Sequence, residues 1–95
     1  MSMSDEGLYV DQFTLAPVTF KRADPIVSNE NWLLVFYLPQ LKMSYKVYFG
    51  MSEQNDKLVN SLIPNVTRAL VQGSIKENKA GDIILRARQI IKEEK

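Results

Sequence analysis

The sequence predicts an α+β domain, in which an antiparallel sheet of three to four strands carries a kinked helix and a C-terminal helix on one face. Three observations predict this fold. The first is a run of seven apolar residues, 32–38, that is typical of a strand covered on both faces. The second is an alternating segment just after this run. The third is a pair of apolar stripes with helical spacing in the C-terminal half.

Residues 32–49 are expected to form a central hairpin. Both faces of its first strand are apolar, because Leu33, Val35 and Tyr37 alternate with equally apolar neighbours. Pro39 ends this run, and the partner strand follows over Ser44 to Phe49. An isolated hairpin is marginally stable in water, so the pair needs a third strand or a helix over it.

The N-terminal quarter predicts a polar tail followed by strand. Residues 1–7 are polar, and residues 8–95 are interpreted as one domain. Residues 8–15 and 18–21 are rich in residues that favour strands, with Pro17 between them. They are expected to form one bent strand or two short strands at a sheet edge, where a proline is tolerated.

The segment after the hairpin predicts the main covering helix. Ser52 is a good N-cap, and the residues after it put apolar side chains on one helical face as far as Leu70. Pro64 removes one backbone hydrogen bond inside this stripe, which favours a kink over two separate helices because the stripe keeps its phase. Gly73 fits a helix C-cap.

A second helix is expected from Asp82 to the C-terminus. Its apolar stripe consists of Ile83, Ile84, Ala87, Ile90 and Ile91, and the charged residues at the end favour helix. A strand over 82–88 is the rival interpretation, since isoleucine also favours sheets.

Composition limits the chemistry that this chain can perform. It has 95 residues, a net charge of +1, and no cysteine or histidine, which removes zinc–thiolate sites, thiol nucleophiles and the commonest general base. Its four glycines are too far apart for a phosphate-binding loop, and its paired carboxylates fit a tail, a helix cap or a solvated face. We therefore expect no catalytic, cofactor-binding or metal-binding residues.

Localisation is expected to be cytoplasmic. The chain begins with acidic residues and leads into no apolar segment of a signal peptide, and its longest apolar run is far too short to span a membrane. Its small size would suit a phage-encoded protein, in which case the host cytoplasm or the virion is expected.

The favoured function is a non-enzymatic protein-interaction module, either a small subunit of an assembly, an oligomer, or an inhibitor. Two surfaces are candidates for the contact. One is the outer face of the expected C-terminal helix, where Leu85 projects away from the stripe beside Arg88, Gln89 and Lys92. The other is the sheet face of Leu33, Val35 and Tyr37.

The alternative function is a nucleic-acid-binding accessory protein. The whole-chain charge gives no general attraction to nucleic acid, so a basic site would have to be local. The candidate residues share a positive charge: Lys21, Arg22, Arg88, Lys92 and Lys95.

Overall fold

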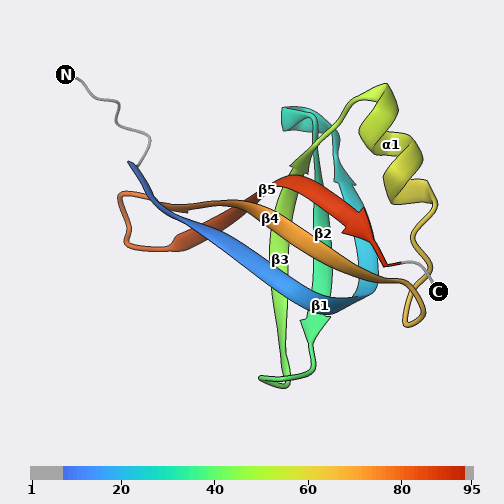
Figure 1. Cartoon of the computed structure of the whole chain (residues 1–95). Coiled ribbons are helices and arrows are strands. Elements are labelled where there is room, and N and C mark those ends of the chain that lie inside the picture. The colour runs from blue at the N-terminus through green and yellow to red at the C-terminus, as the bar shows by residue number, and fades with distance from the viewer. Residues whose placement is uncertain (1–7, 94–95) are drawn as a thin grey trace.

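Over the residues that the structure describes, the chain forms a closed five-stranded barrel with one short α-helix (Figure 1). The structure, a computed structural model, describes residues 8–93 and the side chains of residues 11–93. The strands follow the order β1-β2-β3-β5-β4 around the barrel, and β4 pairs back with β1. The elements are β1 (Leu8–Ile26), a 3₁₀ turn (Val27–Asn29), β2 (Asn31–Leu38), β3 (Met43–Gly50), α1 (Glu53–Asn60), β4 (Arg68–Glu77) and β5 (Ile83–Lys92).

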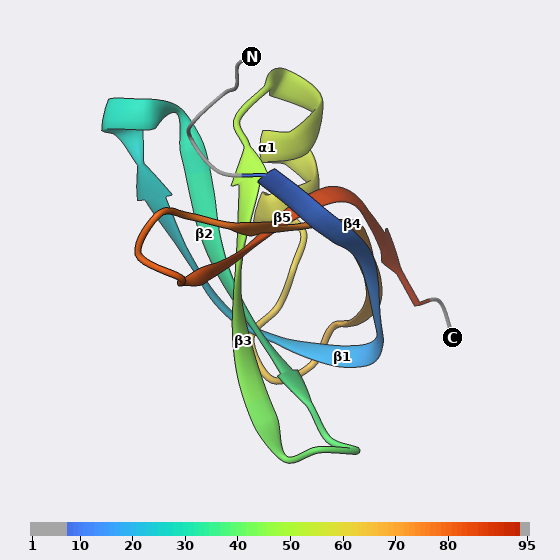
Figure 2. The same cartoon turned by 90° about the vertical axis from the view of Figure 1, so that its left-hand side faces the viewer.

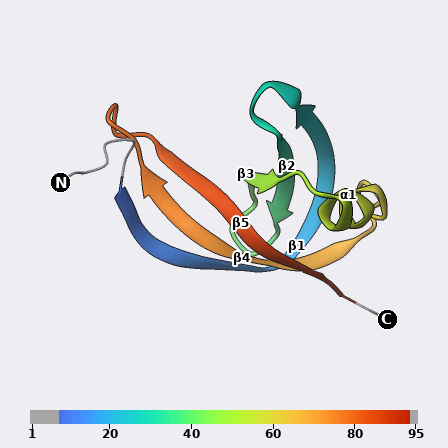
Figure 3. The same ribbon diagram turned by 90° about the horizontal axis from the view of Figure 1, so that it is seen from above.

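Strand β1 closes the barrel because it belongs to both halves of the sheet. Its first part pairs with β4 up to Thr19, and its second part pairs with β2 from Thr19 onward. Seen from above, β1 curves from the β4–β5 arm round to β2 (Figure 3). Neighbouring strands are antiparallel except β3 and β5, which run parallel where Val47–Phe49 meets Leu85–Ala87.

The hydrophobic core lies inside the barrel and is formed by one face of every strand. Phe36 of β2 is fully buried and meets Phe20 of β1 edge to face, with ring centroids 5.8 Å apart. Val47 of β3 and Val71 of β4 are also fully buried. The inward-facing apolar residues of the hairpin therefore form the centre of the core.

Helix α1 covers one end of the barrel, where Val59 and the following Leu62 join the core. Ser52 caps it, accepting a hydrogen bond from the Asn55 N–H at 3.1 Å. Asp56 Oδ1 accepts from Trp32 Nε1 at 2.8 Å, which ties the helix to the start of β2.

The expected α+β fold with a kinked helix is wrong. The helix ends at Asn60, and Pro64 lies in a loop rather than at a kink. Asn65 in this loop has a positive φ of 65°, and the Ile63 N–H donates to Thr67 Oγ1 at 2.8 Å. Because Pro64 cannot continue the helical hydrogen bonding, the loop turns and the chain re-enters the sheet as β4.

The expected C-terminal helix is also wrong, and the rival interpretation of a strand is the correct one. Residues 83–92 form β5. The pairing shifts between Gln72 and Gly73, so that Gly73 faces Ala87 whereas Gln72 faces Gln89. Arg88 is the extra residue of this β-bulge. Because of it, the buried residues Ala87 and Ile90 are three positions apart, which imitates helical spacing.

Gly73 does not cap a helix; it lies within β4 beside the bulge. A Cβ atom added there would lie 1.9 Å from the carbonyl oxygen of Arg86 and 2.8 Å from the Cα of Ala87. Glycine is therefore required for the close backbone approach of β4 and β5.

Three other expectations are confirmed. The central hairpin forms with Trp32 opposite Phe49 and Leu38 opposite Met43. The N-terminal segment is one long bent strand, although it does not lie at a sheet edge, because β1 pairs with both β2 and β4. Ser52 is the helix cap. The polar tail over 1–7 lies outside the described residues.

Candidate functional site

A hollow of about 240 Å³ lies between β3 and the β4–β5 hairpin. Figures 2 and 3 show that the β4–β5 loop and the β1–β2 loop stand apart from one another. We call this cavity the Tyr48 hollow. Its lining residues come from the β1–β2 connection and from β2, β3, β4 and β5: Asn29, Asn31, Tyr48, Lys76, Ile84 and Arg86.

The strand register extends this site across the outer face of the barrel. Leu33 of β2 lies opposite Tyr48 of β3, and Tyr48 lies beside Arg86 of β5. In the next row, Val35 lies between Arg22 of β1 and Lys46 of β3. Side chains opposite each other in a sheet share a face, so these rows form one surface. We call this surface the outer face.

A second aromatic residue lies one row further along the outer face. Tyr37 of β2 is opposite Thr19 of β1 and Ser44 of β3. The Lys21 ammonium lies 5.8 Å from the centroid of the Tyr37 ring, which is cation–π distance. Lys21 also donates a hydrogen bond to Asn65 Oδ1, so the cation is held near the ring.

Positive charge predominates on the outer face and in the Tyr48 hollow. Five basic side chains belong to this region: Lys21, Arg22, Lys46, Lys76 and Arg86. One acidic side chain lies in the same rows, since Asp24 is opposite Leu33 and forms an ion pair with Arg22 at 3.2 Å. Both groups of that pair are more than half exposed, so solvent screens it. The local charge therefore exceeds the net charge of the whole chain.

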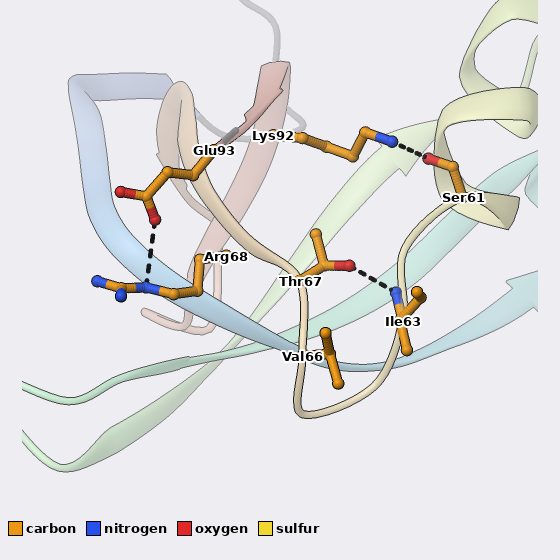
Figure 4. Close-up of a pocket in the computed structure, with 7 residues that line it drawn as sticks. All are labelled: Ser61, Ile63, Val66, Thr67, Arg68, Lys92 and Glu93. Atoms are coloured by element: carbon orange, nitrogen blue, oxygen red, sulfur yellow. Dashed lines mark hydrogen bonds and ion pairs between the residues drawn. The ribbon is translucent and has the colours of Figure 1, made fainter. Parts of the chain in front are cut away.

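A second region, near the C-terminal end of β5, is more apolar. Here a hollow of about 410 Å³ contains Ile63 and Val66, whose exposed fractions are 54% and 65% (Figure 4). We call it the Lys92 hollow. Lys92 Nζ donates to Ser61 Oγ at 2.9 Å on one side, and Arg68 pairs with Glu93 at 3.2 Å on the other.

The predicted sheet surface does form. Leu33, Val35 and Tyr37 all lie half-buried on the outer face of β2. The structure also brings Lys21 and Arg22 to this surface, next to Tyr37 and Val35. Residues that sequence analysis assigned to two different functions are therefore neighbours.

The predicted surface around Leu85 does not form. Leu85 points inward from β5 and packs against the core, because its segment is a strand and not a helix. Arg88 and Gln89 are exposed beside Leu58 of α1, and Arg88 donates to Gln12 Oε1 at 3.0 Å. Lys92 lies in the other region, bonded to Ser61, and Lys95 lies outside the described residues.

Sequence reasoning missed all six residues that line the Tyr48 hollow: Asn29, Asn31, Tyr48, Lys76, Ile84 and Arg86. The signal for Tyr48 was present, because it shares the wetter face of the predicted second hairpin strand and the hairpin register puts it opposite Leu33. The signal for Lys76 and Arg86 was not, because no strand was predicted over residues 68–77 and Arg86 was assigned to a helix rather than to β5.

The described part of the chain, residues 8–93, contains neither a cluster of metal-ligating side chains nor a membrane-spanning helix. No group of three or more acidic side chains in this part of the chain could hold a metal ion. The only α-helix described, α1, is too short and too polar to cross a membrane.

No family model, no curated protein and no solved structure matches this chain. Its topology is nevertheless specific: a five-stranded Greek-key barrel in which the helix follows the third strand and the third and fifth strands are parallel. This arrangement resembles the OB-fold, a five-stranded Greek-key barrel. A fold does not by itself define a function, which depends on the residues of the site.

Proposed function

We propose that this protein binds single-stranded nucleic acid across the outer face and the Tyr48 hollow. The observation that supports this most strongly is the placement of Tyr48 and Tyr37 on adjacent strands among five basic side chains. Proteins that bind single strands combine these two elements, a basic surface for the phosphates and aromatic rings on which bases stack. Of the two non-catalytic classes, the site therefore favours nucleic-acid binding.

The two tyrosines suit stacking because they are half-buried rather than fully buried. Each tyrosine has close neighbours: in the strand register Tyr48 lies between Leu33 and Arg86, and the Tyr37 ring lies below the Lys21 ammonium. A ring with close neighbours loses little side-chain entropy when a base stacks on it. Stacking of one base on an aromatic side chain contributes about 1 to 3 kcal/mol.

The basic side chains favour a polyanion over a neutral oligosaccharide. They lie on both sides of the tyrosines, with Lys46 and Arg22 in one row and Arg86 and Lys76 beside the hollow. Phosphates neutralised by these cations release counterions, so affinity should fall as salt rises. With three to five phosphate contacts, the logarithm of the binding constant should fall with the logarithm of salt concentration with a slope of about −2 to −3.5.

The test is a titration of a fluorescent oligothymidylate of about 12 nucleotides, followed by anisotropy at several salt concentrations. Tyr48→Ala should weaken binding by about 5- to 150-fold, the equivalent of one lost stacking contact. Lys57→Ala is the matched control for charge, because Lys57 is exposed on α1 and belongs to neither region. It should leave the affinity within about twofold.

Duplex DNA of the same sequence and oligouridylate complete the experiment. Weaker binding to duplex is expected, because stacking on Tyr48 needs an unpaired base. The proposal fails if wild-type protein binds no single strand at low salt. It also fails if Tyr48→Ala binds as tightly as wild type while retaining the wild-type circular dichroism spectrum.

A second candidate function, protein binding, is favoured by the Lys92 hollow. Ile63 and Val66 are exposed there with charged residues at the rim, as at small protein contacts. Val66→Asp should then leave the melting temperature within a few degrees and abolish self-association measured by light scattering. If the wild-type protein stays monomeric at high concentration, the Lys92 hollow does not mediate self-association.

A further inference from the structure

Asn31 is the only polar residue among the buried ones in the part of the chain whose side chains are described, with an exposed fraction of 7%. It begins β2, opposite Gly50 of β3, and it lines the Tyr48 hollow. Gly50 leaves space above the amide, since a Cβ atom there would lie 4.0 Å from Asn31 Oδ1. A buried amide beside a hollow needs hydrogen-bond partners.

The partner of Asn31 is Arg86, which also lines the hollow. Arg86 Nη1 donates to Asn31 Oδ1 at 3.2 Å. A guanidinium has five N–H donors and no acceptor, so this contact fixes the amide oxygen toward Arg86 and the amide NH₂ away from it. The contact also holds the guanidinium in one place, which lowers the entropy lost when it binds a ligand.

The hollow therefore offers hydrogen-bond donors next to an apolar surface. Arg86 supplies N–H groups, whereas the Tyr48 ring and Ile84 supply apolar contact. A flat group with two neighbouring acceptors matches this arrangement. Guanine has such an edge in its O6 and N7 atoms, and arginine binds these two atoms in a bidentate manner.

We propose that the Tyr48 hollow binds one guanine base of the strand, stacked on Tyr48 and recognised by Arg86 through O6 and N7. This inference depends on the proposed function and adds a base preference to it. Adenine and cytosine carry an amino donor on the corresponding edge, which would face the guanidinium N–H donors of Arg86. A phosphate group also has acceptors, but its binding would not depend on the base.

The first experiment uses the wild-type protein and four competitor strands. Each is an oligothymidylate in which the central residue is thymine, guanine, adenine or 7-deazaguanine. The guanine strand should compete about 5- to 100-fold better than the adenine strand. The 7-deazaguanine strand, which retains stacking but lacks the N7 acceptor, should lose most of that advantage.

The second experiment changes Arg86 to lysine, which keeps the charge and removes the bidentate geometry. Arg86→Lys should bind oligothymidylate within about threefold of wild type and lose the guanine preference. Arg88→Lys is the matched control: Arg88 lies two residues away and also bonds an amide oxygen, that of Gln12, but does not line the hollow. It should keep the preference.

The outcomes separate the two proposals. Salt-sensitive binding that depends on Tyr48 but is equal for all four strands would overturn the guanine site and leave the proposed function standing, with phosphate as the ligand of Arg86. Absence of binding to every strand would overturn both. Should Arg86→Lys fail to fold, the 7-deazaguanine strand still decides, because equal competition by guanine and 7-deazaguanine overturns recognition through N7.

Discussion

The two faces of strand β2 are made of similar residues and have different environments. On the inner face, Leu34 and Phe36 are fully buried within the barrel. On the outer face, Leu33 and Val35 are only half-buried, although they are as apolar as their inner counterparts. The same strand thus contributes to stability on one side and presents an apolar, aromatic surface on the other.

The difference comes from what lies opposite each face. The inner face meets side chains from the other strands, including Phe20 and Val71, and is closed by the barrel and by α1. On the outer face, the neighbours across the sheet include several basic residues. Apolar residues with a basic surround are suited to bases and phosphates rather than to a further layer of the core. Substitutions on the two faces should therefore have separable effects.

The largest effect is expected for Phe36→Ala on the inner face. Removing a fully buried ring should lower the free energy of unfolding by about 3 to 5 kcal/mol, because a cavity remains and the contact with Phe20 is lost. Urea denaturation followed by circular dichroism measures this change. Val35→Ala on the outer face of the same strand is the control and should cost about 1 kcal/mol or less. Equal costs for the two variants would contradict the distinction between the faces.

A smaller effect is expected for Gly73→Ala, which tests the close approach of β4 and β5. The added methyl group would collide with backbone atoms of Arg86 and Ala87, so the strands must separate at the bulge. The free energy of unfolding should fall by roughly 1 to 3 kcal/mol.

Gly50→Ala is the matched control for that variant. The nearest atom to its added Cβ is 4.0 Å away, so thermal melting should change by only a few degrees. A Gly73→Ala protein that melts like Gly50→Ala would show that the bulge does not require glycine.

The smallest effect is expected for Lys46→Ala on the outer face. Lys46 is exposed opposite Val35, so its removal should leave the unfolding free energy within about 0.5 kcal/mol of wild type. If it contacts one phosphate, the salt slope of oligothymidylate binding should become shallower by about 0.7. An unchanged salt slope would show that the bound oligothymidylate does not pass over this row of the outer face.

The sequence by itself determined the hairpin, the long N-terminal strand and the helix cap, because the signals for these elements are local. Alternation over residues 32–49 needs only the period of two that a strand imposes, and Ser52 needs only the first turn of its own helix. The apolar outer face of Leu33, Val35 and Tyr37 could be identified for the same reason. Its basic neighbours from β1 were visible in the sequence, but their position beside it was not.

Whether the second half of the chain forms helices or strands was decided only by the tertiary structure. The bulge at Arg88 adds one residue to β5, so the buried residues Ala87 and Ile90 acquire a spacing that local patterns assign to a helix. The strand becomes favourable because β4 and β3 lie on either side of it, and Gly73 permits the close contact with β4. The Tyr48 hollow depends on the same long-range pairing. It joins Asn31 to Arg86, residues that are 55 positions apart in the chain. A local sequence pattern cannot show that two such distant residues are in contact.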